Sequence, residues 1–162
     1  MLKKAVADAL NKQVNAELYS AYLYLSMSAY CETIPLKGFA KWLRVQAQEE
    51  QTHALKFYDY IIEAGGTIKL TAIEAPKTTW KSAQEVFEEV YAHEQKVTGM
   101  INGLMDLAIK EKDYATQNML AWFVKEQVEE EANASEILAQ IKMLGSVVGH
   151  LFYLDHQLSK RG

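Results

Sequence analysis

Four long stretches of the sequence repeat apolar residues with the period of an α-helix, and polar residues interrupt each stretch near its middle. The clearest interruption lies in residues 36–64, where steps of three and four residues connect Phe39, Leu43, Gln46, Glu50, His53, Phe57, Tyr60 and Ala64. Glu50 and His53 therefore share the face that a helix turns toward the core. A carboxylate buried there costs several kcal/mol of free energy unless its charge is compensated. We therefore expect another group to balance the charge that residues 49–53 bring into the core.

Residues that stop helices are few, since the 162-residue chain has only two prolines and eight glycines. We predict helices over residues 3–32, 36–64, 82–112 and 113–144, followed by a short amphipathic helix over residues 146–160. Pro35, Gly65 and Gly145 mark helix ends, and Ser82 with Glu85 has the spacing of a capping box at a helix start.

Residues 65–81 connect the second predicted helix to the third and are too many for a tight turn. A helix of about 30 residues is roughly 45 Å long. An extended connection of this length reaches about 55 Å, so it can run the full length of a helix. The other joins are short and make antiparallel pairs. The pattern predicts an all-α protein of one domain, residues 1–162, with a four-helix bundle over residues 3–144 and one long crossover.

The other three long helices carry the same interruption at mid-length. Their stripes are Leu10, Val14, Glu17, Ala21, Tyr24 and Ser28 in residues 3–32; Ala83, Phe87, Val90, Glu94, Val97, Ile101, Leu104 and Ala108 in residues 82–112; and Leu120, Phe123, Gln127, Glu130, Ala134, Ile137, Ile141 and Leu144 in residues 113–144. Because the polar positions lie near each helix midpoint, they reach one level of the bundle whether neighbouring helices run parallel or antiparallel. We expect one polar cluster inside the bundle, made of Glu17, Glu50, His53, Glu94, Gln127 and Glu130.

Four buried glutamates bring about four negative charges into a medium of low dielectric, and two divalent cations would balance them. Oxygen-rich ligation with a single imidazole favours iron, manganese or zinc over copper(I), and redox-active iron suits it best. The alternative is that the acids are solvated or hydrogen-bonded to one another. A polar layer of that kind would fix the register of the helices without binding metal.

The composition excludes several classes of function. Seventeen basic and 21 acidic residues leave a net charge of -4, which gives no basic surface for nucleic acid. There is no run of about 18 apolar residues for a membrane span, and the first residues do not read as a signal peptide. The single cysteine, Cys31, excludes an internal disulfide and fits a reducing compartment. We expect a cytoplasmic protein.

The Glu50-x-x-His53 motif, together with Glu17, Glu94 and Gln127-x-x-Glu130, resembles the non-haem ferritins of bacteria and archaea. The similarity covers nearly the whole chain and includes the runs at residues 16–20, 47–50, 91–95 and 126–131. It implies a ferritin-like bundle with a short fifth helix near a symmetry axis, in a shell of about 24 subunits.

The resemblance also implies roles for the polar residues. The first iron would be held by Glu17, Glu50 and His53, and the second by Glu94 and Glu130, with Glu50 bridging the two ions. Gln127 would be a hydrogen-bonding group beside them. Tyr24, seven residues after Glu17 on the same face, would be a possible electron donor, with an ordinary core tyrosine as the alternative.

Glu49, Glu126 and Glu129 form a second layer, since each precedes an inward polar residue and is rotated from it by about 100°. The resemblance implies a third iron site there. Trp122 would flank that site or pack beside it, and we expect Glu131 to be solvated.

Two differences from related families argue against a bacterioferritin and a rubrerythrin. Gln51 stands where haem-binding bacterioferritins have a methionine, so no haem is expected, and one cysteine cannot supply the rubredoxin module of a rubrerythrin. We expect His93, His150 and His156 at the surface or in packing, and Cys31 to be inert.

The resemblance implies an iron-storage ferroxidase. Fe(II) and O2 would be its substrates, and the ferric product would grow a mineral inside the shell. One alternative is a di-metal oxidase or oxygenase without storage. The other is a structural helical bundle with a polar layer.

Overall fold

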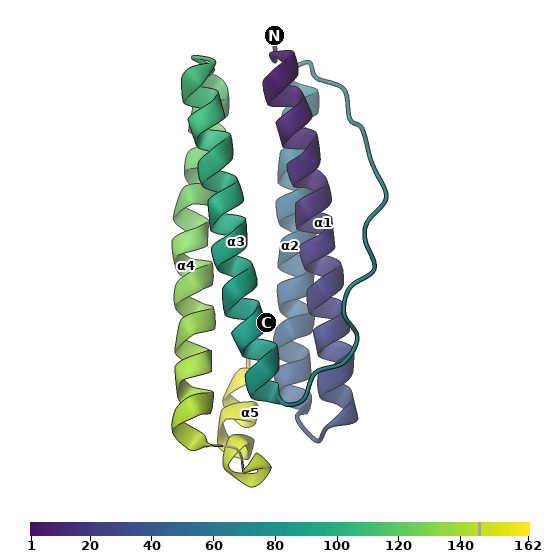
Figure 1. The fold of residues 1–162 in the computed structure, drawn as a ribbon, viewed down its shortest axis with the longest axis vertical. Coiled ribbons are helices and arrows are strands. Elements are labelled where there is room, and N and C mark those ends of the chain that lie inside the picture. The colour runs from purple at the N-terminus through teal and green to yellow at the C-terminus, as the bar shows by residue number, and fades with distance from the viewer. Residues whose placement is uncertain (146) are drawn as a thin grey trace.

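The computed structural model describes residues 1–145 and 147–162. Its helices are α1 (Lys4–Thr33), α2 (Lys37–Glu63), α3 (Ala83–Lys110), α4 (Tyr114–Leu144) and α5 (Phe152–Leu158), with a 3-10 turn, η1 (Val148–Leu151), before α5. Figure 1 shows α1 to α4 side by side as a bundle. The predicted all-α bundle is confirmed, and the four long helices begin and end within two residues of their predicted bounds.

The helix ends follow local sequence signals. Ser82 caps α3 by accepting from the backbone N–H of Glu85 at 3.2 Å, as the capping-box spacing predicts. The Glu85 carboxylate accepts from the backbone N–H of Lys81 instead of Ser82, so the return bond lies one residue earlier than expected. α2 stops at Gly65, whose φ of 76° belongs to the left-handed region that glycine adopts without strain.

The connection between α2 and α3 runs the length of the bundle beside α1 (Figure 1). Side chains of α1 bind it at successive points. Asn11 donates to the carbonyl of Thr67 and accepts from the N–H of Lys69, while Ser26 Oγ donates to the carbonyl of Lys77 at 2.6 Å. The connection therefore runs in the same direction as α1, and α2 and α3 are parallel, as the predicted crossover requires.

The apolar core has two parts, one on each side of a polar layer. One part includes Phe39 and Phe87 and reaches α5, while the other includes Phe57 and Phe123. Between the two parts lie the mid-helix polar residues, all buried as the stripes predicted: Glu17, Glu50, His53, Glu94, Gln127 and Glu130. Four members of those stripes are only half-buried: Ala21, Tyr60, Ala64 and Leu144.

The C-terminal segment differs from its predicted form. Ser146, the predicted first residue of the fifth helix, lies outside the described residues, and the regular α-helix spans only Phe152–Leu158. α5 buries Leu154 and Leu158. Asp155 accepts from the backbone N–H of Phe39 at 2.9 Å, so it satisfies a free donor at the start of α2.

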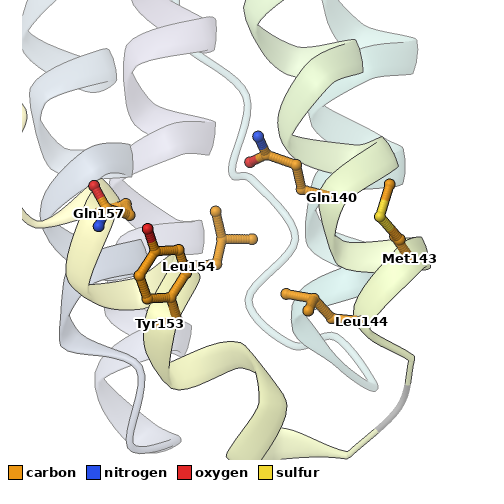
Figure 2. Close-up of a pocket in the computed structure, with 6 residues that line it drawn as sticks. All are labelled: Gln140, Met143, Leu144, Tyr153, Leu154 and Gln157. Atoms are coloured by element: carbon orange, nitrogen blue, oxygen red, sulfur yellow. The ribbon is translucent and has the colours of Figure 1, made fainter.

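A groove of about 430 Å³ remains between the end of α4 and α5, as Figure 2 shows. Its lining side chains are Gln140, Met143, Leu144, Tyr153, Leu154 and Gln157. None of the predicted metal ligands lines it, so this groove and the buried acids are separate features. Within the described residues, none of the helices has a stretch long and apolar enough for a membrane span.

Gly38 tests the contact between α5 and α2. A Cβ at this position would lie 1.8 Å from the carbonyl oxygen of Asp155, so Gly38→Ala must push α5 away and should cost about 1–3 kcal/mol. Chemical denaturation and limited proteolysis of residues 147–162 would measure the loss. Gly99→Ala is the control, because a Cβ there meets nothing within 4 Å. The change should stabilise α3 by about 0.5–1 kcal/mol, since alanine loses less conformational entropy in a helix than glycine. Equal effects of the two changes would contradict the packing.

Candidate metal centre

Five ionisable side chains from all four long helices meet in the middle of the bundle. Each is at most 5% exposed. Their ligand atoms, with those of Glu126, make three groups in which all atoms lie within 4.8 Å of one another: Glu17, Glu50 and His53; Glu50, Glu94 and Glu130; and His53, Glu126 and Glu130. Glu50 belongs to two of the groups, so it is placed between them.

The spacing of Glu50 and His53 on α2 makes them neighbours. Residues three apart lie on the same face of a helix, and His53 Nδ1 is 3.2 Å from Glu50 Oε2. The other ring nitrogen, Nε2, is 3.8 Å from Oε1 of Glu126 on α4. The imidazole therefore reaches both sides of the cluster.

Two glutamine amides hold three of the acids. Gln13 Nε2 donates to Glu17 at 2.8 Å, and Gln46 Nε2 donates to Glu50 at 3.1 Å and to Glu130 at 2.7 Å. Sequence reasoning assigned neither glutamine a role, although Gln46 lies on the apolar stripe. The available signal was the spacing, since each glutamine precedes its glutamate by four residues and so shares its face.

Glu94 has different donors. The Tyr24 hydroxyl donates to Glu94 Oε1, and Gln127 Nε2 donates to Glu94 Oε2 at 3.1 Å. The predicted positions of Tyr24 and Gln127 beside the acids thus agree with the structure, while their roles in chemistry stay predictions. Glu131, expected to be solvated, instead accepts from Thr98 Oγ1 at 3.1 Å. That expectation was wrong because the half-buried Glu131 faces α3.

Burial is the main cause that raises the pKa of every acid in the cluster. For Glu17 and Glu50 the pKa lies well above the ordinary value, because neighbouring carboxylates add repulsion to desolvation. Burial and the charge of Glu94 raise the pKa of Glu130 to about 7. Burial also raises the pKa of Glu94 itself. Without a cation, the cluster therefore favours protonated acids.

The donor set fits divalent metal ions. Among the described residues, Glu17 Oε2 is a buried side-chain oxygen without a hydrogen-bond partner, which is unfavourable unless a ligand uses it. The cluster offers carboxylate oxygens and one imidazole. Iron, manganese and zinc accept this mixture, and a cation would remove the repulsion that raises the pKa values. The assignment of individual ligands stays a prediction.

The outer acids do not share one position. Glu126 lies with His53 and Glu130, whereas Glu49 is paired with Arg161 at 2.6 Å and Glu129 is exposed. The structure therefore does not bring Glu49, Glu126 and Glu129 into one group, and a third metal site stays a prediction. Arg161 was not expected here.

Trp122 lies beside the cluster. Its ring is edge-on to His53, with 5.5 Å between ring centroids, and Lys56 Nζ lies 3.9 Å from the centroid of the indole ring. Trp122 therefore covers the imidazole on the side of α4, and the predicted packing role fits these contacts.

The remaining candidates lie off the cluster. His150 and His156 are exposed, as expected. His93 is half-buried, with Nε2 2.8 Å from Ser20 Oγ and its ring against Tyr24, and burial lowers its pKa to about 4. Cys31 is buried, and burial raises the pKa of its thiol to about 12, which keeps it protonated and unreactive.

Comparisons with known proteins identify the family to which the chain is similar. Residues 7–144 match the Ferritin-like domain family. The chain is 45% identical over 161 residues to a bacterial non-heme ferritin of Bacteroides fragilis (strain 638R), covering 99% of this chain and 100% of that protein. It is 40% identical over 159 residues to one of Escherichia coli O6:H1, covering 98% and 96%. An open pore ferritin from Archaeoglobus fulgidus superposes with a TM-score of 0.98 at 49% identity, covering all of both chains.

The raised pKa values predict how the stability of the metal-free protein depends on pH. The folded state binds more protons than the unfolded state between the ordinary glutamate pKa of 4.5 and the value of about 7 for Glu130. The free energy of unfolding should therefore fall as the pH rises through this window. Denaturation with guanidinium at several pH values measures it, and Glu130→Gln should reduce the slope. A stability that rises over the same window would contradict the prediction.

Proposed function

The chain belongs to the ferritin family, in its prokaryotic non-haem branch, and we propose that it is a ferroxidase that stores and detoxifies iron. Fe(II) binds at the carboxylate cluster and O2 oxidises it. The ferric product is then deposited inside a shell of subunits. The observation that carries the proposal is the buried cluster of four glutamates and one histidine, contributed by all four helices.

We assign the first iron to Glu17, Glu50 and His53, and the second to Glu94 and Glu130, with Glu50 bridging. The position of Glu50 in two of the three groups supports the bridge. The unpartnered oxygen of Glu17 supports a ligand on that side. Both ions are substrates of the reaction.

Two ions at one centre match the electron count of the reaction. Each Fe(II) gives up one electron, and the pair reduces one O2, with two protons, to hydrogen peroxide. Carboxylates stabilise Fe(III) more than Fe(II), because the attraction grows with the charge of the ion. The Tyr24 hydroxyl donates a hydrogen bond to Glu94, and Tyr24 is our candidate for a further electron donor. Gln127 orients Glu94 from α4.

Storage requires an enclosed volume, and we propose a homo-oligomeric shell of about 24 subunits. Large apolar residues support subunit contacts, since Tyr22, Leu25 and Leu55 on α1 and α2 are each about half exposed.

Glu49, Glu126 and Glu129 are our candidates for a third iron site. A cytoplasmic location is part of the proposal, because a reducing compartment maintains Fe(II).

Iron loading separates this function from the two alternatives. Fe(II) is added to the metal-free protein without oxygen, and air is then admitted. Iron storage predicts that hundreds of ferric ions stay soluble with each assembly, whose size light scattering should place near 24 chains. Retention of only two ions per chain would indicate an oxidase without storage. Absence of bound iron would indicate a structural bundle. A monomer or dimer at physiological salt would contradict storage.

A substitution at Glu50 tests the bridge. Glu50→Ala should remove the fast phase of Fe(II) oxidation and lower the initial rate at least about tenfold, because both ions lose a ligand. Stopped-flow absorbance follows the ferric product, and circular dichroism checks that the helices stay intact. Glu63→Ala is the matched control, an exposed acid near the end of the same helix, and its rate should equal that of the unchanged protein. An unchanged rate in Glu50→Ala would rule out the assignment.

A further inference from the structure

The end of the chain returns to α2 beside the carboxylate cluster. After α5, the Arg161 guanidinium lies over the Trp42 ring, with Cζ 4.3 Å from the ring centroid. Nη1 donates to the carbonyl of Trp42 at 3.3 Å. Nη2 donates to Gln46 Oε1 at 2.9 Å and to Glu49 Oε2 at 2.6 Å. In Figure 1 the C-terminus lies above α5, turned back toward the middle of the bundle.

These contacts determine which way the Gln46 amide points. A guanidinium has only donors, so the atom of Gln46 that faces Arg161 must be the oxygen. The amide nitrogen then faces Glu50 and Glu130 and donates to both. A reversed amide would place its NH2 against the guanidinium and its oxygen against two carboxylates. The contact with the guanidinium would be repulsive, and so would the contact with the two acids once they are ionised, as metal ligation requires.

We propose that Arg161 is a positioning residue of the metal centre. It acts through Gln46, whose amide it holds in the orientation that donates to Glu50 and Glu130. The inference rests on the proposed function, in which Glu50 bridges the two iron ions and Glu130 holds the second one.

The same guanidinium also holds the carboxylate of Glu49 in an ion pair. Its charge-assisted bond occupies Oε2 of an acid that is 44% exposed at its side chain. A cation at the outer layer would have to compete with Arg161 for this oxygen. Arg161 therefore favours the inner ligands over the outer acid.

The tail has other attachments, so the role of Arg161 can be separated from docking of the tail. Lys41 Nζ donates to the carbonyl of Ser159 at 2.8 Å, and Asp155 accepts from the N–H of Phe39 at 2.9 Å. Neither bond involves Gln46 or Glu49. Loss of Lys41 weakens the tail without changing the amide, which makes Lys41→Met the matched control for Arg161→Met.

The test measures binding of Co(II), which is stable in air and absorbs visible light when bound, together with the rate of Fe(II) oxidation. The intact protein is compared with Arg161→Met, Gln46→Met, the double variant and Lys41→Met. We expect Arg161→Met to weaken Co(II) binding about 3- to 10-fold, less than the loss typical of a residue that bonds a ligand directly. Lys41→Met should bind Co(II) as the intact protein does.

The double variant identifies the route. If Arg161 acts through Gln46, then Arg161→Met should cause no further loss of affinity once Gln46 is methionine. Additive losses, equal losses in Lys41→Met and Arg161→Met, or an unchanged affinity in Arg161→Met would each overturn the inference while leaving the proposed function in place. Failure of the intact protein to bind Co(II) would overturn both, so the two failures are distinguishable.

Discussion

The structure depends on the burial of like charges at one level. Four glutamates lie between two apolar clusters. Desolvation raises the pKa of each, and repulsion within the cluster adds to it for Glu17, Glu50 and Glu130. A bundle that only needed stability would gain from apolar residues at these positions. The amides of Gln13, Gln46 and Gln127 offset part of the cost. A divalent cation would remove the remaining cost, so the free-energy cost of burying the acids and the affinity for metal have one origin.

The fold was predictable because its signals are local and repeated. The stripe on α3 is an example, since each residue from Ala83 to Ala108 on that face is buried as predicted. The length of residues 65–81 was enough to predict the parallel arrangement of α2 and α3. The fifth helix was less predictable. Its apolar residues fit a longer helix, but the start of the segment instead forms a 3-10 turn and the position of α5 depends on Asp155 meeting α2.

The clustering of the acids with His53 was predictable because these residues interrupt apolar stripes at equal depth. The residues that surround this cluster were harder to predict from the sequence. Gln13 and Gln46 could have been found from their spacing to Glu17 and Glu50. Arg161 could not, since 112 residues separate it from Glu49 and no periodicity connects a chain end to a helix. Helical rotation likewise predicts equivalent positions for Glu49, Glu126 and Glu129, but it does not predict which residues of other segments they meet. In the structure each of the three has different surroundings.

The long crossover divides the centre into two halves along the chain. The hairpin of α1 and α2 carries Glu17, Glu50 and His53, and the hairpin of α3 and α4 carries Glu94 and Glu130. Each hairpin forms through contacts close in sequence, whereas the centre needs both. The connection acts as a tether that keeps the second hairpin at a high effective concentration beside the first. The acids of the two hairpins meet only when the hairpins dock, so the repulsion of Glu50 by Glu94 and Glu130 opposes that step and not the formation of either hairpin.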